Sequence, residues 1–256
     1  MALRAERRSL IGWGSGMAAV VLMMAAMWPS IRNMPGLQDF LKHYPPALRK
    51  VFRLETYATG SGYLNAELFS LMVPAMFLVF GIGHGARLVA GEEEDGTLEV
   101  LVTVAPSRHV VIAQKAVAFA STVALLGVAL FGAGLIANLV VDMHIGIVEL
   151  ARGTISVTLL GLQYGLIAFA IGAGTGRRGV AIGAATGIAI AMYMVYILGQ
   201  LMPAVRPWQG MSSFSEALGH GPIGAAWSPG LLTLIAVSVA VTVVGGVLFD
   251  RRDLRS

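Results

Sequence analysis

The densest charge in this chain is the run from Glu92 to Asp95, four consecutive carboxylates that stand between two long apolar segments. Lipid cannot accommodate adjacent carboxylates, because each ionised group loses its hydration there without gaining a partner. The run must therefore lie in water or against a water-soluble partner. The chemistry that these residues offer is recognition by charge, at a point where a hydrophobic chain leaves the membrane.

The residues after this run have the spacing of a short amphipathic helix. Gly96 can end or bend the preceding helix, and Leu98 and Leu101, with the valine that follows, form one apolar face at i, i+3 and i+4. Pro106 stops the pattern, since proline disfavours helical conformation in the residue before it. We expect a short helix over residues 97–103 beneath the membrane. The alternative is a solvated connector whose acids serve solubility.

Signals for catalysis or nucleotide binding are weak. Residues 174–179 match G-x-G-x-x-G, but that fingerprint needs a preceding strand and a following acidic residue, whereas this segment joins two apolar runs. We interpret it as a tight turn. The sequence contains no G-x-x-x-x-G-K-[ST], H-E-x-x-H or G-x-S-x-G motif and no cysteine. Of the five histidines only His84 falls within an apolar run, so we expect neither a catalytic site nor a metal site in this chain.

Three polar residues lie deepest within the apolar runs, namely Asn138, Gln163 and Tyr164. In apolar surroundings a side-chain amide needs a partner or water. We expect these residues either to line a substrate pathway or to make hydrogen bonds between helices.

Glycines recur at four-residue spacing, as in Gly81 with Gly85 and Gly161 with Gly165. Such ridges let helix backbones approach closely. They serve packing within one chain or, alternatively, a homodimer face.

Composition indicates a surface covered mostly by lipid. Hydrophobic residues make up 56% of the chain and charged residues 12%, whereas soluble domains carry about 25% charged residues. Six apolar runs reach the length of about 20 residues that a membrane-spanning helix needs. They cover approximately residues 10–28, 68–89, 116–141, 154–175, 180–202 and 231–249. The sequence therefore predicts an all-α integral membrane protein with six transmembrane helices, in one domain over residues 1–256.

The basic residues indicate the orientation of this bundle. An even number of spans places both termini on one side, and basic residues near span ends favour the cytoplasm. With the N-terminus inside, eleven of the 18 Lys and Arg residues face inward. These are Arg4, Arg7, Arg8, Arg87, Arg108, Lys115, Arg177, Arg178, Arg251, Arg252 and Arg255. Because they flank apolar runs rather than share one face, the net charge of +4 does not indicate nucleic-acid binding.

Two loops have internal pattern. Within the predicted outer loop 29–67, Pro45 and Pro46 can start a helix whose apolar residues include Leu48 and Phe52. This helix lies on the outer leaflet or caps the protein itself. The loop between the fifth and sixth spans mixes Pro, Gly and Ser with aromatic residues, which fits an interfacial belt or a re-entrant segment.

The predicted cytoplasmic loop 90–115 also carries a family resemblance. The pattern E-x-x-x-G-T-L-E-x-L from Glu92, followed by Pro106, Arg108 and Lys115, resembles the signature loop of ABC-2 type transporter permeases. The ending F-D-R-R-D-L from Phe249 is similar to the close of many such subunits. The resemblance extends over essentially the whole chain.

This resemblance implies a six-span bacterial inner-membrane permease with cytoplasmic termini, which dimerises with a second copy or a homologue and binds two copies of a separate ABC ATPase. A coupling helix after the second span would contact that ATPase. The residues carried over to this role are Glu92, Gly96, Thr97, Leu98, Glu99, Leu101, Pro106 and Arg108.

The function expected from these observations is export of a lipophilic or amphipathic compound such as a drug, antibiotic, lipid or peptide. ATP and Mg²⁺ would be bound by the partner ATPase, because this sequence has no phosphate loop. An ATP-independent channel or an assembly scaffold is the main alternative. An intramembrane enzyme is a weaker one.

Overall fold

The computed structural model describes residues 2–97, 108–224 and 229–251, which are helical with no strand among them. Six helices within these residues are long and apolar enough to cross a membrane. They are α1 (Ala2–Arg32), α5 (Met72–Ala86) with its helical continuation to Glu94, α8 (Arg108–Val140), α9 (Ile147–Thr175), α10 (Arg178–Leu201) and α12 (Gly230–Asp250). The predicted all-α fold with six spans is confirmed.

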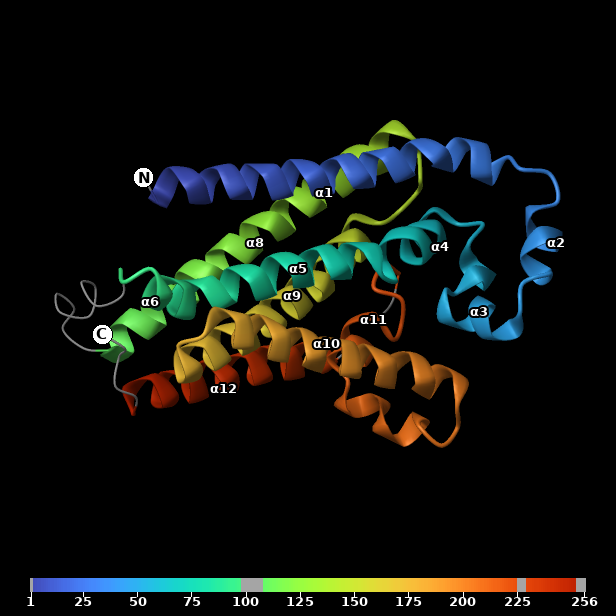
Figure 1. Ribbon diagram of the computed structural model, residues 1–256. Helices are drawn as coiled ribbons and strands as arrows, with labels where there is room; N and C mark the ends of the chain where they lie inside the picture. Colours follow the sequence, from blue (N-terminus) through green and yellow to red (C-terminus); the bar gives the residue numbers. More distant parts are fainter. Residues whose placement is uncertain (1, 98–107, 225–228, 252–256) are drawn as a thin grey trace.

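The long helices run side by side (Figure 1). The start of α1, the end of α12 and the short helix α6 (Glu92–Glu94) lie at one end of the bundle, which we call the terminal end. α5 reaches this end through a π-helical turn, η3 (Arg87–Gly91), that continues directly into α6. α8 begins at Arg108, well before the predicted span start near 116, because its polar first turns remain helical outside the apolar run.

The opposite end, the distal end, is built from short helices. They are α2 (Leu37–Lys42), α3 (Pro46–Val51), η1 (Leu54–Thr56), α4 (Gly60–Leu64), the π-helical turn η2 (Asn65–Phe69), η4 (Arg206–Met211) and α11 (Ser213–Leu218). α3 is the helix expected from the proline pair, with Pro46 in its first turn. It packs against η1 and α10, so it caps the protein's own distal end.

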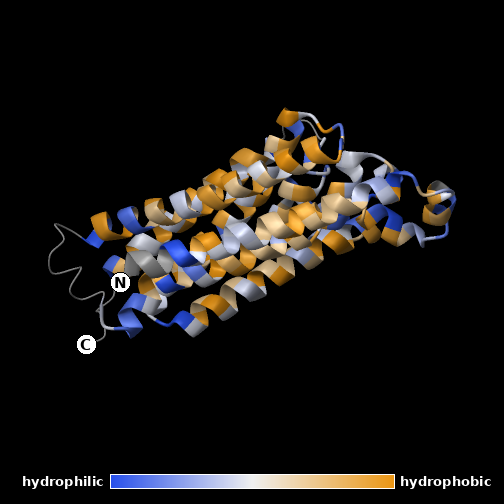
Figure 2. Cartoon of the chain, turned by 90° about the horizontal axis from the view of Figure 1, so that it is seen from above, coloured by the Kyte–Doolittle hydropathy of each residue, from blue (hydrophilic) through white to orange (hydrophobic). Residues whose placement is uncertain are grey.

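The centre of the bundle is α9, which packs against α5, α8, α10 and α12. In the most apolar 18-residue stretch of α9, 67% of the residues are buried inside the protein. The corresponding shares for α1 and α10 are 17% and 22%. α1 and α10 are therefore peripheral helices. Their outward side chains are apolar, and Figure 2 shows hydrophobic residues along the helices and hydrophilic ones gathered toward the ends of the bundle.

Glycine contacts set the closest helix packing, between α5 and α9. A Cβ built on Gly81 would lie 2.5 Å from the backbone oxygen of Gly161, and Gly85 faces Gly165 in the same way. These four glycines are therefore used for packing within the chain. The turn at residues 174–179 is also explained, because Gly176 adopts φ 62° and ends α9 just before α10 begins.

Candidate functional site

The acidic run at the terminal end is bound into the bundle by an ion pair. Glu92 Oε2 accepts a hydrogen bond from Lys115 Nζ on α8 at 2.5 Å, and the two side chains are 29% and 11% exposed. A pair so far removed from water is screened little by salt. It therefore fixes α6, and through it α5, to the first turns of α8.

Glu94 reaches a third helix. Its Oε1 accepts a hydrogen bond from the backbone N–H of Arg178, the first residue of α10, at 2.9 Å. The first N–H groups of a helix lack intrahelical acceptors and favour a negative partner. Glu93, between Glu92 and Glu94, is buried. The acidic run thus connects α5, α8 and α10, a use that its composition did not reveal.

Gly96 ends the α5–α6 helix. It adopts φ 69°, its N–H donates to the oxygen of Glu93 at 3.0 Å, and the N–H of Thr97 donates to the oxygen of Glu92 at 2.9 Å. This pair of bonds is the Schellman arrangement, in which a left-handed glycine satisfies the last carbonyls of a helix.

The other predicted coupling residues follow this glycine. Leu98, Glu99, Leu101 and Pro106 lie outside the described residues, as does the expected helix after Thr97, so that part stays a prediction.

The chain is anchored again where α8 begins. The guanidinium carbon of Arg108 lies 6.0 Å from the ring centroid of Phe249 on α12, within the range of a cation–π contact. His109 Nε2 lies 3.6 Å from Asp250 Oδ2, which forms an ion pair when the histidine is protonated. The segment 98–107 therefore joins two points that are held to α5, α8, α10 and α12.

Of the predicted pathway residues, Gln163 and Tyr164 lie near the middle of α9, where they contact α11. Gln163 Nε2 donates to Ser213 Oγ at 2.8 Å, and the ring centroids of Tyr164 and Phe214 are 5.5 Å apart. Helix α11, between α10 and α12, thus packs against the middle of α9. The re-entrant placement of this segment relative to the membrane stays a prediction. Among the described residues, Gln163 Oε1 is buried without a hydrogen-bond partner.

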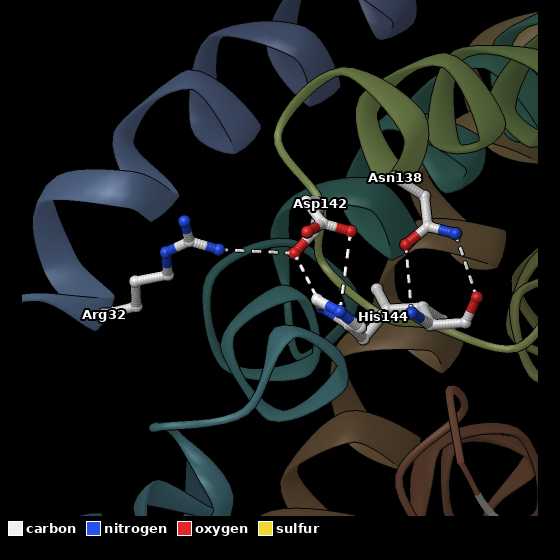
Figure 3. Close-up of polar contacts among 5 residues, drawn as sticks. Arg32, Asn138, Asp142 and His144 are labelled. Carbon is white, nitrogen blue, oxygen red and sulfur yellow. Dashed lines mark hydrogen bonds and ion pairs between the residues drawn. The ribbon is translucent and has the colours of Figure 1, made fainter.

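Asn138 lies apart from this pair, near the distal end of α8 (Figure 3). Its amide exchanges two hydrogen bonds with the backbone of Ile145, each 2.9 Å long. Asp142 and His144, both with positive φ, form the turn between them, and Arg32 at the end of α1 donates to the Asp142 oxygen at 3.4 Å. These contacts give Asn138 a structural partner in the α8–α9 loop.

Two apolar grooves flank α5, and none of the three predicted pathway residues lines them. The α1–α5 groove, of about 860 Å³, runs between these helices beneath α2 and α3. The α5–α10 groove, of about 570 Å³, lies on the other side. They share Leu71, Ala75 and Val79, so α5 forms the wall between them. Both volumes are in the range of about 300–1,000 Å³ that is typical of small-molecule sites.

Sequence reasoning missed one residue of the α1–α5 groove. Glu67 lies in η2 and accepts a hydrogen bond from the Tyr57 hydroxyl at 2.6 Å. Burial first, and the Glu67 carboxylate next, raise the pKa of Tyr57 above its ordinary value. The sequence signal that could have identified Glu67 is its position as a lone carboxylate directly before the apolar run 68–89.

Six membrane-spanning helices define a multi-pass membrane protein, with drug-sized apolar grooves along its helices. The family described as "Multidrug efflux system permease Rv1217c, C-terminal domain" has a model that matches residues 1–250, and the chain belongs to this family. No similar curated protein was found. The family agrees with the identification as an ABC-2 type permease, and the chain is a membrane permease of an efflux family.

Proposed function

We propose that this chain is the membrane-spanning subunit of an ATP-driven ABC exporter for lipophilic or amphipathic compounds, and that a separate ATPase binds the segment 98–107. In this proposal the terminal end faces the cytoplasm of a bacterial cell. Two permease halves associate with two ATPase copies, which bind ATP and Mg²⁺. The observation that carries the proposal is the anchoring of both ends of this segment to the bundle.

The contacts at both ends of the segment 98–107 would transmit a displacement of this segment to the transmembrane helices. A displacement of the segment 98–107 would act on α5 through α6, on α8 and α10 through Glu92 and Glu94, and on α12 through Arg108. Closely packed helices move as units rather than deform continuously. Movement of α5 relative to α1 and α10 would change both grooves at once.

The peripheral helices supply surface for the second half. A Cβ on Gly12 or Gly16 of α1 would meet no described atom of a neighbouring helix within 4 Å, and the same holds for Gly179, Gly183 and Gly187 of α10. Small residues on lipid-facing helices permit close helix association. A second half packed against α1 and α10 would enclose the grooves and give substrate a route between the halves.

The test is affinity purification of the tagged chain from its own host membranes in mild detergent. We expect an ATPase with a phosphate-loop sequence to co-purify in stoichiometric amount, and the complex to hydrolyse ATP. Glu99→Lys should reduce both ATPase recovery and ATP turnover about tenfold or more, because it reverses a charge in the proposed contact.

The matched control is Glu55→Lys, the same change at an exposed carboxylate of the distal end. It should leave recovery and turnover unchanged. Absence of any ATPase from the purified complex, or equal behaviour of the two variants, would refute the proposal. Ionic currents through the purified chain without ATP would instead favour a channel.

A further inference from the structure

The α1–α5 groove carries a single charge. Its lining is apolar and rich in aromatic rings, including Trp13, Phe40, Tyr44 and Phe52, and Glu67 is the one ionisable acid or base other than tyrosine among the described residues that line it. The α5–α10 groove has no Asp, Glu, Lys, Arg or His in its described lining. Of the two grooves, therefore, only the α1–α5 groove has a described charged residue that could distinguish ligands by their charge.

Glu67 has a donor but no counter-ion. The Tyr57 hydroxyl donates to its Oε1, and no described Lys, Arg or His forms an ion pair with it. The side chain is half-buried. A carboxylate partly removed from water is stabilised by a nearby cation, and a partly buried ion pair is screened less by salt than an exposed one.

The walls of the α1–α5 groove indicate what else a ligand must offer besides its charge. Aromatic faces attract cations through their quadrupoles, and apolar walls favour a ligand that brings hydrophobic surface. The volume of about 860 Å³ accommodates a drug-sized molecule. One carboxylate matches one positive charge, and the surrounding lining offers no partner for an anion.

We propose that the α1–α5 groove binds lipophilic organic monocations, with Glu67 as their counter-ion and the aromatic rings as their wall. This inference rests on the proposed export function and names the substrate class of the permease. Molecules with one ammonium or phosphonium centre and bulky apolar substituents fit this chemistry.

The test measures equilibrium binding of radiolabelled tetraphenylphosphonium to the purified full chain in zwitterionic nanodiscs, with empty nanodiscs as background. Tetraphenylborate is the comparison ligand, because it has the same four phenyl groups and the opposite charge. We expect saturable binding of the phosphonium and no saturable binding of the borate. Glu67→Gln should weaken phosphonium binding about tenfold or more, a change of about 1.4 kcal/mol or more.

Two controls make the result specific to Glu67. The Tyr57 hydroxyl can still donate to the amide oxygen of the Glu67→Gln variant, so the local structure has a partner after the change. Glu55→Gln neutralises a carboxylate that does not line the groove and should bind the phosphonium as the wild type does. The borate comparison needs no variant and remains decisive if Glu67→Gln fails to fold.

Equal binding of the two ligands by the wild type, or wild-type phosphonium affinity in Glu67→Gln, would overturn the inference. The assay uses neither ATP nor an ATPase. Failure of cation binding while an ATPase co-purifies would therefore reject the substrate class alone, and cation binding without any ATPase would reject the coupling alone.

Discussion

Gly81→Ala tests whether the α5–α9 glycine contact holds the bundle together. The added Cβ would lie 2.5 Å from the Gly161 oxygen and 3.3 Å from its carbonyl carbon, whereas ordinary contact begins at 3.4 Å. Both atoms are backbone, so no side chain can turn away, and the helices must separate by roughly 1 Å. Overpacking of this kind costs about 1–3 kcal/mol. Stability would be measured by SDS-induced unfolding in mixed micelles, followed by tryptophan fluorescence.

Gly83→Ala is the matched control on the same helix. A Cβ there would meet no described atom of another element within 4 Å. Both substitutions gain the same helix propensity, up to about 1 kcal/mol in water, so the difference between the variants isolates the contact. We expect Gly81→Ala to be less stable than Gly83→Ala by about 1–3 kcal/mol. Equal stabilities would refute the close packing of α5 on α9.

Two further predictions concern the distal end. Asn138→Leu should destabilise the protein by about 2 kcal/mol, because it leaves the N–H and oxygen of Ile145 unpaired. Hydrogen exchange should accelerate in residues 141–146, and unchanged exchange there would count against a stabilising role of the two Asn138–Ile145 hydrogen bonds. Tyr63 donates to the Met24 oxygen, and burial first, then Glu67, raises its pKa to about 12. A folded-state pKa raised above the ordinary value of about 10 gives stability that is complete below pH 10 and is lost as pH rises toward 12. Tyr63→Phe should therefore lose less stability than the wild type across that window, as followed by unfolding midpoints, and parallel pH profiles would contradict the shift.

The sequence predicted the six spans because lipid requires long apolar runs, a demand that each segment meets independently of the others. It also predicted where α3 and the α9–α10 turn begin, since proline and glycine act locally. It could not predict the grooves, because Glu67 and Tyr57 meet Trp13 and Phe40 only after α1 and α5 pack.

Tertiary packing also explains why the sequence left two interpretations of the polar residues within the apolar runs, a substrate pathway or hydrogen bonds between helices. Asn138 and Gln163 are equivalent in the sequence, as amides in apolar surroundings. The structure gives Asn138 two hydrogen bonds to Ile145, in the loop that follows α8, and gives Gln163 one hydrogen bond to Ser213 on α11. Whether an amide bonds nearby or far away in the chain depends on tertiary packing, which periodicity does not encode.

The acids of the loop 90–115 fall into two sets with different physical roles. Glu92 and Glu94 already have partners in the bundle, in Lys115 and the N–H of Arg178, so they are poorly available to an external protein. In the proposed complex, recognition of the ATPase then depends on two other acids, which are Asp95, an exposed residue, and Glu99. Glu92→Gln should lower the free energy of unfolding by about 2 kcal/mol, since Lys115 loses its charged acceptor, and ATPase affinity should change little.

Glu99→Gln should do the reverse, reducing ATPase affinity with no loss of stability. The two variants remove one negative charge each from the same loop, so net charge cannot account for a difference between them. Unfolding midpoints and ATPase recovery, measured on the same preparations, separate the two effects. If Glu92→Gln abolished ATPase binding in a fully stable protein, Glu92 would itself belong to the docking surface, and this division of the acids would be wrong.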